Sequence, residues 1–217
     1  MLSMFNGNKI YKIENGVKKR VFFIPGMSIK FKGKNSVAEI HYPLPELKRC
    51  RIKLGTNCKF TMESSDKWVR KLEVFVTGKN NEVCIGKNLS VTSGCEIHLG
   101  PEDNLKVEIG DNCMFGKKIM IRATDGHTIY DESTKELLNK GKNVKIGNHV
   151  WLSENVVVLK GAVIPDNCIV GINSMVTSSF PNDKAGVLAV GTPAKIVKEG
   201  VNWNRVPPSW YLEGKEL

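Results

Sequence analysis

The sequence predicts an all-β fold in which the chain winds into a solenoid, and three registers of one repeat support this prediction. An aliphatic residue recurs at every sixth position from residue 146 to residue 176. Three positions after an anchor, the chain carries Asn or Gly in four cases and His149 in one, and these types tolerate positive φ best. Four positions after it stands a small or aliphatic residue. The anchors are Ile146, Leu152, Val158, Ile164, Val170 and Val176.

This period indicates a triangular coil. A chain that turns a corner every six residues closes a triangle after three hexads, and stacked triangles share one hydrophobic core. An amphipathic helix would repeat its apolar residues at three and four positions, and a meander would alternate by two between hairpin turns. Neither pattern fits the sequence.

The same registers recur upstream and locate an insertion. Coil starts at Ile146 and Ile164 are 18 residues apart, whereas Ile109 and Ile146 are 37 apart. About 19 residues, roughly 124–143, therefore leave the coil as a loop, and structureless loops of this length are usually functional. Corresponding coil edges share an aliphatic pair followed by Gly, at Ile52–Gly55, Val83–Gly86, Val107–Gly110 and Val144–Gly147.

We expect three segments along the chain. Residues 1–50 form a β cap whose hairpin turns at Asn15-Gly16, a strong hairpin signal, and which covers the open end of the solenoid. Residues 51–195 form the solenoid. Residues 196–217 form a short helix and a tail that packs on the solenoid or on a neighbouring subunit.

Composition narrows the class of protein. The formal charge of +10 over 217 residues suits an anionic ligand such as a phosphate-bearing cofactor. No recognition motif or aromatic-interleaved basic patch points to nucleic acid. No apolar run is long enough for an integral membrane segment, and no secretory signal opens the chain, so we expect a cytoplasmic protein.

The six cysteines fit the interior better than a metal site or disulfides. They form no CxxC or Cys/His ligand spacing, and we expect no metal. Four of them occupy the small inward slot of the repeat, which predicts reduced core residues. These four are Cys58, Cys95, Cys113 and Cys168.

The loop carries the candidate for chemistry. His127 is the only one of the four histidines in a segment that breaks the register. His149 fills a corner slot, His98 follows an inward Ile97 and points outward, and His41 lies in a stretch without a readable pattern. Only His127 invites a functional role.

Four motifs, taken in order, give the chain a resemblance to a known family. They are Asp125-Gly-His127, Ile146-Gly-Asn-His-Val-Trp151-Leu, Gly171-Ile-Asn-Ser-Met-Val-Thr177 and Val190-Gly-Thr-Pro-Ala-Lys195. Over about residues 83–205 the chain resembles the hexapeptide-repeat acyltransferases, in particular sugar O-acetyltransferases of the galactoside, maltose and surface-polysaccharide type. The resemblance implies a left-handed parallel β-helix and a homotrimer with active sites between subunits.

The resemblance also implies roles for individual residues. His127 would act as the general base that removes a proton from the acceptor as it attacks acetyl-CoA, and Asp125 would orient its imidazole. A turn Asp that caps its own backbone is an equal alternative for Asp125. Trp151 would lie against the thioester arm of the co-substrate. Other residues of the acetyl-CoA groove would be Glu154, Gly171, Ile172, Thr177 and Ser178.

The phosphate contacts follow the family pattern less closely. Related enzymes often have Lys next to the matching Thr, whereas this chain has Ser178-Ser179. The departure shifts the expected phosphate contact to Lys195, with Lys160 and Lys184 as alternatives.

The expected function is acetyl-CoA-dependent acetylation of a sugar hydroxyl in a surface polysaccharide or its precursor. N-acetylation of a nucleotide-linked amino sugar is the alternative, because one histidine base serves oxygen or nitrogen. A zinc enzyme like the γ-class carbonic anhydrases would need two histidines five positions apart, which the sequence lacks. A non-catalytic solenoid would be expected to have uninterrupted coils.

Overall fold

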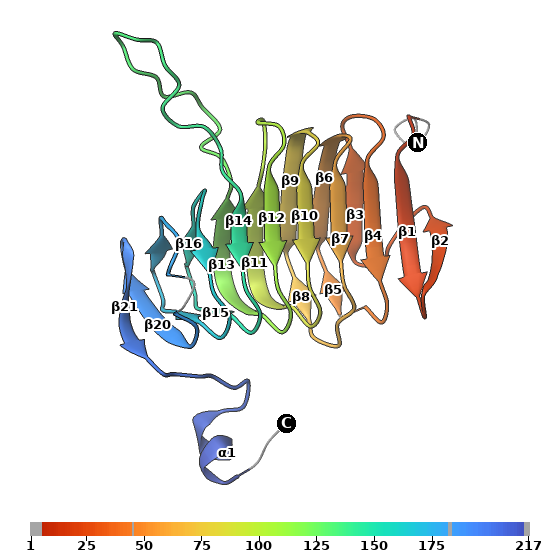
Figure 1. Cartoon of the computed structure of the whole chain (residues 1–217). Helices are drawn as coiled ribbons and strands as arrows, with labels where there is room; N and C mark the ends of the chain where they lie inside the picture. The colour runs from red at the N-terminus through yellow and green to blue at the C-terminus, as the bar shows by residue number, and fades with distance from the viewer. Residues whose placement is uncertain (1–5, 45, 182–183, 215–217) are drawn as a thin grey trace.

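The computed structural model describes residues 6–44, 46–181 and 184–214, and within them the chain winds as a β-helix of stacked coils. Strands of successive coils pair in parallel, and the coil axis runs from the N-terminal hairpin to the C-terminal strands (Figure 1). Each regular coil has three faces that meet at three corners. The predicted all-β solenoid is confirmed.

Face one is a single ladder of strands. Its order is β17-β14-β12-β10-β7-β4-β1-β2, and all neighbours pair in parallel except β1 and β2. The bounds are β1 Lys9–Glu14, β2 Val17–Val21, β4 Val37–His41, β7 Lys59–Met62, β10 Glu82–Ile85, β12 Lys106–Ile109, β14 Val144–Ile146 and β17 Val163–Ile164.

Faces two and three share two long strands that bend around a corner. The first part of β11 pairs with β8 on face two, and its second part pairs with β9 on face three. The strand β13 does the same with β15 and β16. The bounds are β3 Met27–Phe31, β5 Leu47–Lys48, β6 Cys50–Thr56, β8 Val69–Arg70, β9 Leu72–Lys79, β11 Ser90–His98, β13 Met114–Arg122, β15 Trp151–Leu152, β16 Val157–Val158, β18 Ile169–Val170 and β19 Met175–Val176.

The N-terminal segment is a hairpin followed by coil strands. The strands β1 and β2 form the antiparallel hairpin expected at Asn15-Gly16, where both residues have positive φ. The strands β3 and β4 lie in the segment predicted to form a cap, but they pair in parallel with β6 and β7. The parallel ladders thus begin within residues 1–50. As a division into domains, 1–50, 51–195 and 196–217 stays a prediction.

The C-terminal part adds a hairpin, a tail and a short helix. The strand β20 (Val187–Gly191) pairs in parallel with β18, and β21 (Ala194–Glu199) pairs with β20 antiparallel. The strand β21 therefore covers the start of residues 196–217, where the sequence predicts only a helix and a tail. The helix α1 is limited to Pro208–Leu212.

The repeat registers have the roles that the sequence assigned to them. The aliphatic anchors are buried in one continuous core that runs along the coil axis. The corner residues have positive φ: 57° at Asn155, 80° at Gly161, 60° at Asn167 and 57° at Asn173. His149, at 53°, takes the same conformation. The residue types at the corners therefore allow the chain to turn, and the anchors supply the apolar area that stabilises the stack.

Corner asparagines also bond to one another between coils. Asn57 donates through its side chain to Asn80 at 3.3 Å, and Asn80 donates to Asn104 at 3.1 Å. A second pair joins Asn88 to Asn112 at 3.1 Å. These amide ladders connect equivalent positions of adjacent coils along the outside of the stack.

The four cysteines of the inward slot are buried, as predicted, and all six cysteines are free thiols. Burial raises the pKa of the Cys113 thiol to about 12 and that of the half-buried Cys84 thiol to about 11. Burial likewise raises the pKa of Cys95. The thiolate form that nucleophilic catalysis requires is thereby disfavoured at these positions.

Candidate active site

The predicted insertion is a long loop that leaves face three after β13 and returns at β14. It projects far from the coils as a narrow hairpin-like excursion (Figure 1). One carboxylate ties both ends of the loop to the preceding coil. Glu102 accepts a hydrogen bond from the Thr124 hydroxyl through one oxygen and from the Gly141 N–H at 2.6 Å through the other. Thr124 is fully buried, so the loop has a fixed base.

A network around Asp125 holds the first turn of the loop. The Asp125 carboxylate forms an ion pair with Lys160 and accepts a hydrogen bond from the Asn139 side chain at 2.9 Å. Lys160 also donates to the Asn139 carbonyl at 2.7 Å. The hydrogen bond from Lys160 is the main cause that lowers the pKa of Asp125. The carboxylate is therefore held ionised between Asn139, on the returning side of the loop, and Lys160 of a following coil.

His127 is positioned through its backbone. Its carbonyl accepts a hydrogen bond from the Asn139 side chain at 2.7 Å, so Asn139 joins His127 and Asp125. Its side chain is exposed and lines a small cavity of about 140 Å³ together with Glu102, Leu137 and others. Across the described ranges, no hydrogen bond or ion pair reaches the imidazole. The Asp125 carboxylate thus orients the loop backbone and not, within this chain, the imidazole.

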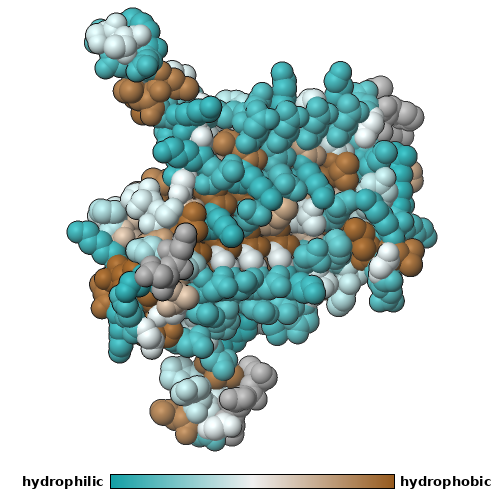
Figure 2. Space-filling view, in the orientation of Figure 1, coloured by the Kyte–Doolittle hydropathy of each residue, from teal (hydrophilic) through white to brown (hydrophobic). Residues whose placement is uncertain are grey.

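The outer part of the loop exposes apolar side chains. Tyr130 and Leu137 form an antiparallel bridge, and each is more than half exposed. Ile129 and Leu138 are exposed to a similar degree. In Figure 2 apolar atoms gather on this projecting loop, beyond the hydrophilic surface of the coils. Beyond the bridge, Asp131 closes the turn by accepting from Ser133 and Thr134, and these bonds lower its pKa to about 2.

Trp151 lies on face two, where it borders a second cavity. Its strand β15 pairs with β13 and β18, and its ring is tilted by 49° against Trp203, with the ring centroids 6.1 Å apart. The cavity has a volume of about 550 Å³, and Ile169 and Tyr211 form other parts of its wall. An aromatic side chain on an open apolar pocket can hold a flexible organic ligand.

The C-terminal tail builds one wall of this cavity. Trp203 stacks on His149 with the rings 4.2 Å apart and nearly parallel, and its indole N–H donates to the His149 carbonyl at 2.8 Å. Arg205 inserts its guanidinium among coil corners, where it donates to the Ser90 hydroxyl at 2.5 Å and to the Cys113 carbonyl at 3.0 Å. The tail is therefore fastened over the corner between faces one and two.

Three further predicted residues meet at the corner between faces two and three. Glu154 forms an ion pair with Lys117 at 3.2 Å, and its carbonyl accepts from the Asn173 N–H at 3.0 Å. Ile172 lies next to Asn173 and is 59% exposed. At Gly171, a Cβ atom would stand only 2.7 Å from a methyl group of Val190, so only glycine fits without a shift. Glu154, Gly171 and Ile172 thus lie on neighbouring coils of one corner.

The other predicted groove residues lie apart from this corner. Thr177 and Ser178 are exposed at the end of face three, at the level of Lys160. Lys195 is exposed on β21. Of the alternative lysines, Lys160 is bound to Asp125, and Lys184 forms an ion pair with Glu199 at 2.9 Å.

The geometry separates His127 from Trp151 within one chain. The loop leaves the corner between faces three and one, whereas Trp151 lies on face two, which is opposite that corner. Glu154 lies at the far edge of face two. Within one chain, His127 and Trp151 therefore line different cavities.

The sequence did not point to Asn139, to Lys160 as an anchor of the loop, or to the tail residue Arg205. Asn139 gives no signal in the sequence, because it lies in the part of the chain without a repeat. Arg205 offers a weak signal, since a lone Arg among tail aromatics suits a tail that packs on exposed carbonyls.

No group of three or more His, Cys, Asp or Glu side chains in the described residues could hold a metal ion. No helix in the same residues has the length and apolar character needed to cross a membrane.

Comparisons with known proteins agree on the kind of protein. A scan against protein-family models finds no match. The polysialic acid O-acetyltransferase of Neisseria meningitidis is 33% identical over 165 residues, which are 71% of this chain and 75% of that protein. The polysialic acid O-acetyltransferase of Escherichia coli O1:K1 / APEC is 33% identical over 130 residues, 60% of this chain but only 40% of that protein.

A solved structure extends the likeness to almost the whole chain. The crystal structure of the polysialic acid O-acetyltransferase OatWY matches with a TM-score of 0.65 and 26% identity, over 92% of this chain and 91% of that chain. The shared fold is the left-handed β-helix of the hexapeptide-repeat acyltransferases, so this class of enzyme is the one that the coils and the inserted loop define. The chain belongs to the hexapeptide-repeat O-acetyltransferase family that includes these polysialic acid O-acetyltransferases.

Proposed function

We propose that this enzyme transfers the acetyl group of acetyl-CoA to a hydroxyl of a surface polysaccharide, with His127 as the general base. The observation that carries the proposal is the exposed His127 imidazole on a loop whose base is fixed by Glu102 and by the network of Asp125, Lys160 and Asn139. The relatives named for polysialic acid favour an acidic glycan as the acceptor.

The reaction needs one proton acceptor and one acyl donor. The imidazole removes the proton of the acceptor hydroxyl while that oxygen attacks the thioester carbonyl carbon. The new C–O bond forms and the C–S bond breaks. The proton then passes from the imidazolium to the leaving thiolate, which releases coenzyme A with a free thiol and restores the neutral imidazole. General-base action of this kind contributes on the order of 10²–10⁴-fold.

The co-substrate would lie along the corner of Glu154 and Ile172 and against Trp151. Three properties support this placement: the open cavity beside Trp151, the exposed Ile172, and the glycine at 171 that allows close approach of the chain. Thr177 and Ser178 lie at the other edge of face three, at the level of Lys160. Lys195 would contact a phosphate, because it is exposed and has no ion pair in the described part of the chain.

A homotrimer in the cytoplasm completes the proposal. The separation of His127 from Trp151 within one chain, together with the exposed apolar loop, supports a site shared between subunits. Ile129 and Leu138 would be covered when the loop packs on a neighbouring copy. Acetyl-CoA is made and used inside the cell, which agrees with the cytoplasmic placement.

The test is replacement of His127 by Ala in an assay with acetyl-CoA and sialic acid polymers. We expect transfer to fall on the order of 10²–10⁴-fold while the oligomer and acetyl-CoA binding are retained. His98→Ala is the matched control, because His98 lies on a coil and pairs with Glu96 at 3.1 Å. Full turnover of the His127→Ala enzyme would refute the mechanism. If the enzyme acetylates the amine of a nucleotide-linked amino sugar and no hydroxyl, it is an N-acetyltransferase and the proposal of O-acetylation is wrong.

A further inference from the structure

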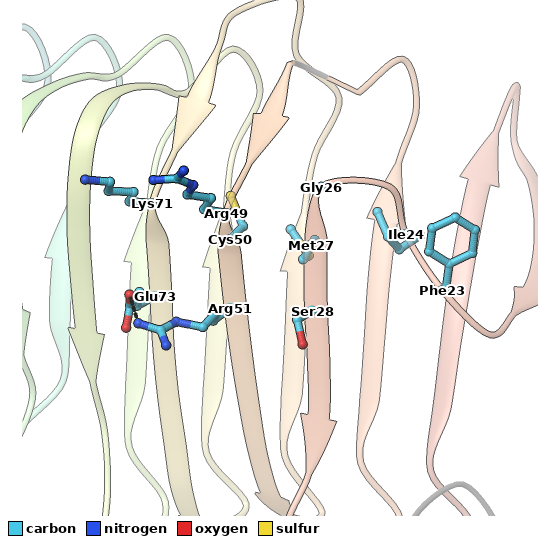
Figure 3. A pocket seen from close by; sticks show the side chains of 10 residues that line it. All are labelled: Phe23, Ile24, Gly26, Met27, Ser28, Arg49, Cys50, Arg51, Lys71 and Glu73. Atoms are coloured by element: carbon cyan, nitrogen blue, oxygen red, sulfur yellow. Dashed lines mark hydrogen bonds and ion pairs between the residues drawn. The ribbon is translucent and has the colours of Figure 1, made fainter. Parts of the chain in front are cut away.

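We propose a second carbohydrate site in the N-terminal coils, which binds a distant part of the same acidic glycan chain; it rests on the proposed function. The site is a cavity of about 660 Å³ on the outside of β3, β6 and β9 (Figure 3). Phe23, Arg49 and Lys71 supply the side chains that matter. None of these residues belongs to the catalytic loop or to the proposed acetyl-CoA corner.

Arg49 and Lys71 give the cavity two positive charges beyond the ion pair of Arg51 with Glu73. Arg49 and Lys71 occupy equivalent corners of successive coils, since the Lys71 N–H donates to the Lys48 carbonyl at 2.9 Å. Figure 3 shows their side chains extending in the same direction, whereas Arg51 is joined to Glu73. In the part of the chain that the structure describes, neither Arg49 nor Lys71 forms an ion pair. Two adjacent cations without a counter-charge attract an anion.

Both cations stand at corners with positive φ. Arg49 has a φ of 57° and Lys71 a φ of 54°, a conformation in which most corners of this chain carry Asn or Gly. A long basic side chain gains nothing from positive φ, whereas Asn tolerates it well. Lys118, on the same corner, and Lys135, in the inserted loop, share this conformation, so basic residues with positive φ occur at four described positions, three of which lie on one corner.

An aromatic side chain borders the same cavity. Phe23 is 71% exposed, and its neighbour Phe22 is 75% exposed. The next residue, Ile24, is buried and bridges to Met27, which fixes the turn that presents Phe23. Figure 3 shows Phe23 at one end of the cavity and the side chains of Arg49 and Lys71 toward the other end, so a glycan of several residues can lay one ring against Phe23 while Arg49 pairs with a carboxylate farther along the chain.

The cavity is in line with the proposed acetyl-CoA corner. Arg49, Lys71, Gly94, Lys118 and Asn155 have positive φ and occupy the corner between faces two and three on successive coils. Four coil spacings of about 4.8 Å separate Arg49 from Asn155, or roughly 19 Å. A single sugar ring cannot span this distance, but a polymer that lies along the corner can. Lys118 adds a further exposed cation between the two ends.

The functional consequence depends on acceptor length. A long acidic chain is held by the N-terminal cavity while one of its residues is acetylated. A short acceptor reaches only the transfer site. The cavity therefore lowers the KM for long acceptors without changing the chemical step.

The first test is the double variant Arg49→Gln/Lys71→Gln, assayed with long sialic acid polymers and with a sialic acid dimer. We expect the KM for the polymer to rise about tenfold, with kcat unchanged and with no change for the dimer. Phe23→Ala should raise the same KM without a change in net charge. The matched control is Lys19→Gln/Arg20→Gln, which removes two exposed charges from β2 outside the cavity. A polymer KM of the Arg49→Gln/Lys71→Gln variant equal to that of the control variant would overturn the proposal.

The second test separates this proposal from the proposed function. Binding of a fluorescently labelled sialic acid polymer is measured with the His127→Ala enzyme in the absence of acetyl-CoA. We expect binding that weakens with salt, that a neutral maltooligosaccharide does not compete for, and that the double variant loses. This result supports the cavity even if the wild-type enzyme acetylates no glycan. Unchanged binding in the double variant, or a changed oligomeric state that identifies the cavity as a subunit contact, would overturn it.

Discussion

The inserted loop and the C-terminal tail are both irregular, yet they relate to the solenoid in opposite ways. The tail is fastened to the coils before its helix: Trp203 is 8% exposed, and Arg205 donates to backbone carbonyls of two coils, whereas α1 has no buried residue. The loop is fastened only at its base, through Glu102 and the Asp125 network, and beyond Tyr130 its side chains face outward.

The difference shows how one scaffold serves two needs. The tail forms one side of the cavity beside Trp151, so its contacts with the coils fix the shape of that cavity. The loop holds His127 at its fixed base, beside Glu102 of the preceding coil, while its outer part stays available to another copy. The same residue type marks the contrast, because His149 is stacked and hydrogen-bonded under the tail whereas the His127 imidazole is open.

The largest expected effect is on the stability of tail docking, at Arg205. Arg205→Ala removes hydrogen bonds from a charged group to the Ser90 hydroxyl and to coil carbonyls, and it should destabilise tail docking by about 3 kcal/mol. Hydrogen exchange of the tail amides and the thermal midpoint would measure the loss. Arg51→Ala, which removes only a surface ion pair, should cost less than about 1 kcal/mol. Equal protection of the tail in both variants would show that Arg205 does not fasten it.

A smaller effect is expected at the base of the loop. Asn139→Ala removes the bonds from one amide to the Asp125 carboxylate and the His127 carbonyl, so kcat should fall about tenfold with the KM for acetyl-CoA unchanged. Steady-state kinetics on purified enzyme would measure both constants. Glu136→Ala, on the exposed part of the same loop, serves as the control. A rise in KM alone would contradict a positioning role for Asn139.

The smallest expected effect is the change in loop stability with pH. The folded-state pKa of Asp125 is lowered, so its ion pair with Lys160 stabilises the loop above the ordinary carboxyl pKa of about 3.9 and is lost as the pH falls through the folded value. Because the pair is partly exposed, the loss should stay below about 1 kcal/mol. Hydrogen exchange of residues 124–143, compared between wild type and Asp125→Asn at pH 6 and pH 3, would detect it. A difference that is as large at pH 3 as at pH 6 would exclude the ionised carboxylate as its cause.

The regular part of the fold could be predicted because its cause is local. A corner at Asn155 or Gly161 depends on positive φ within the residue itself, and each anchor lies six positions from the next. The loop was found for the same reason, as an interval in which the period fails. His127 followed from its place in that interval, and its role as general base stays a prediction.

The remaining contacts join residues that no short pattern connects. Lys160 reaches Asp125 across 35 positions, and Arg205 reaches Asn88 across 117, only because the coils stack. The strands β3 and β4 were missed for a related reason. A strand with alternating burial fits a cap as well as a coil, and only its parallel pairing with β6 and β7 distinguishes the two.

The amide ladders repeat one contact at a constant spacing, the distance between adjacent coils. Asn57, Asn80 and Asn104 make the same contact from coil to coil, so a coil that carries Asn at this corner fits between any two others. Removing or adding such a coil would shift the N-terminal cavity relative to the transfer site by about 4.8 Å and leave both local structures unchanged. The number of such coils therefore sets the distance between the proposed N-terminal cavity and the proposed transfer site.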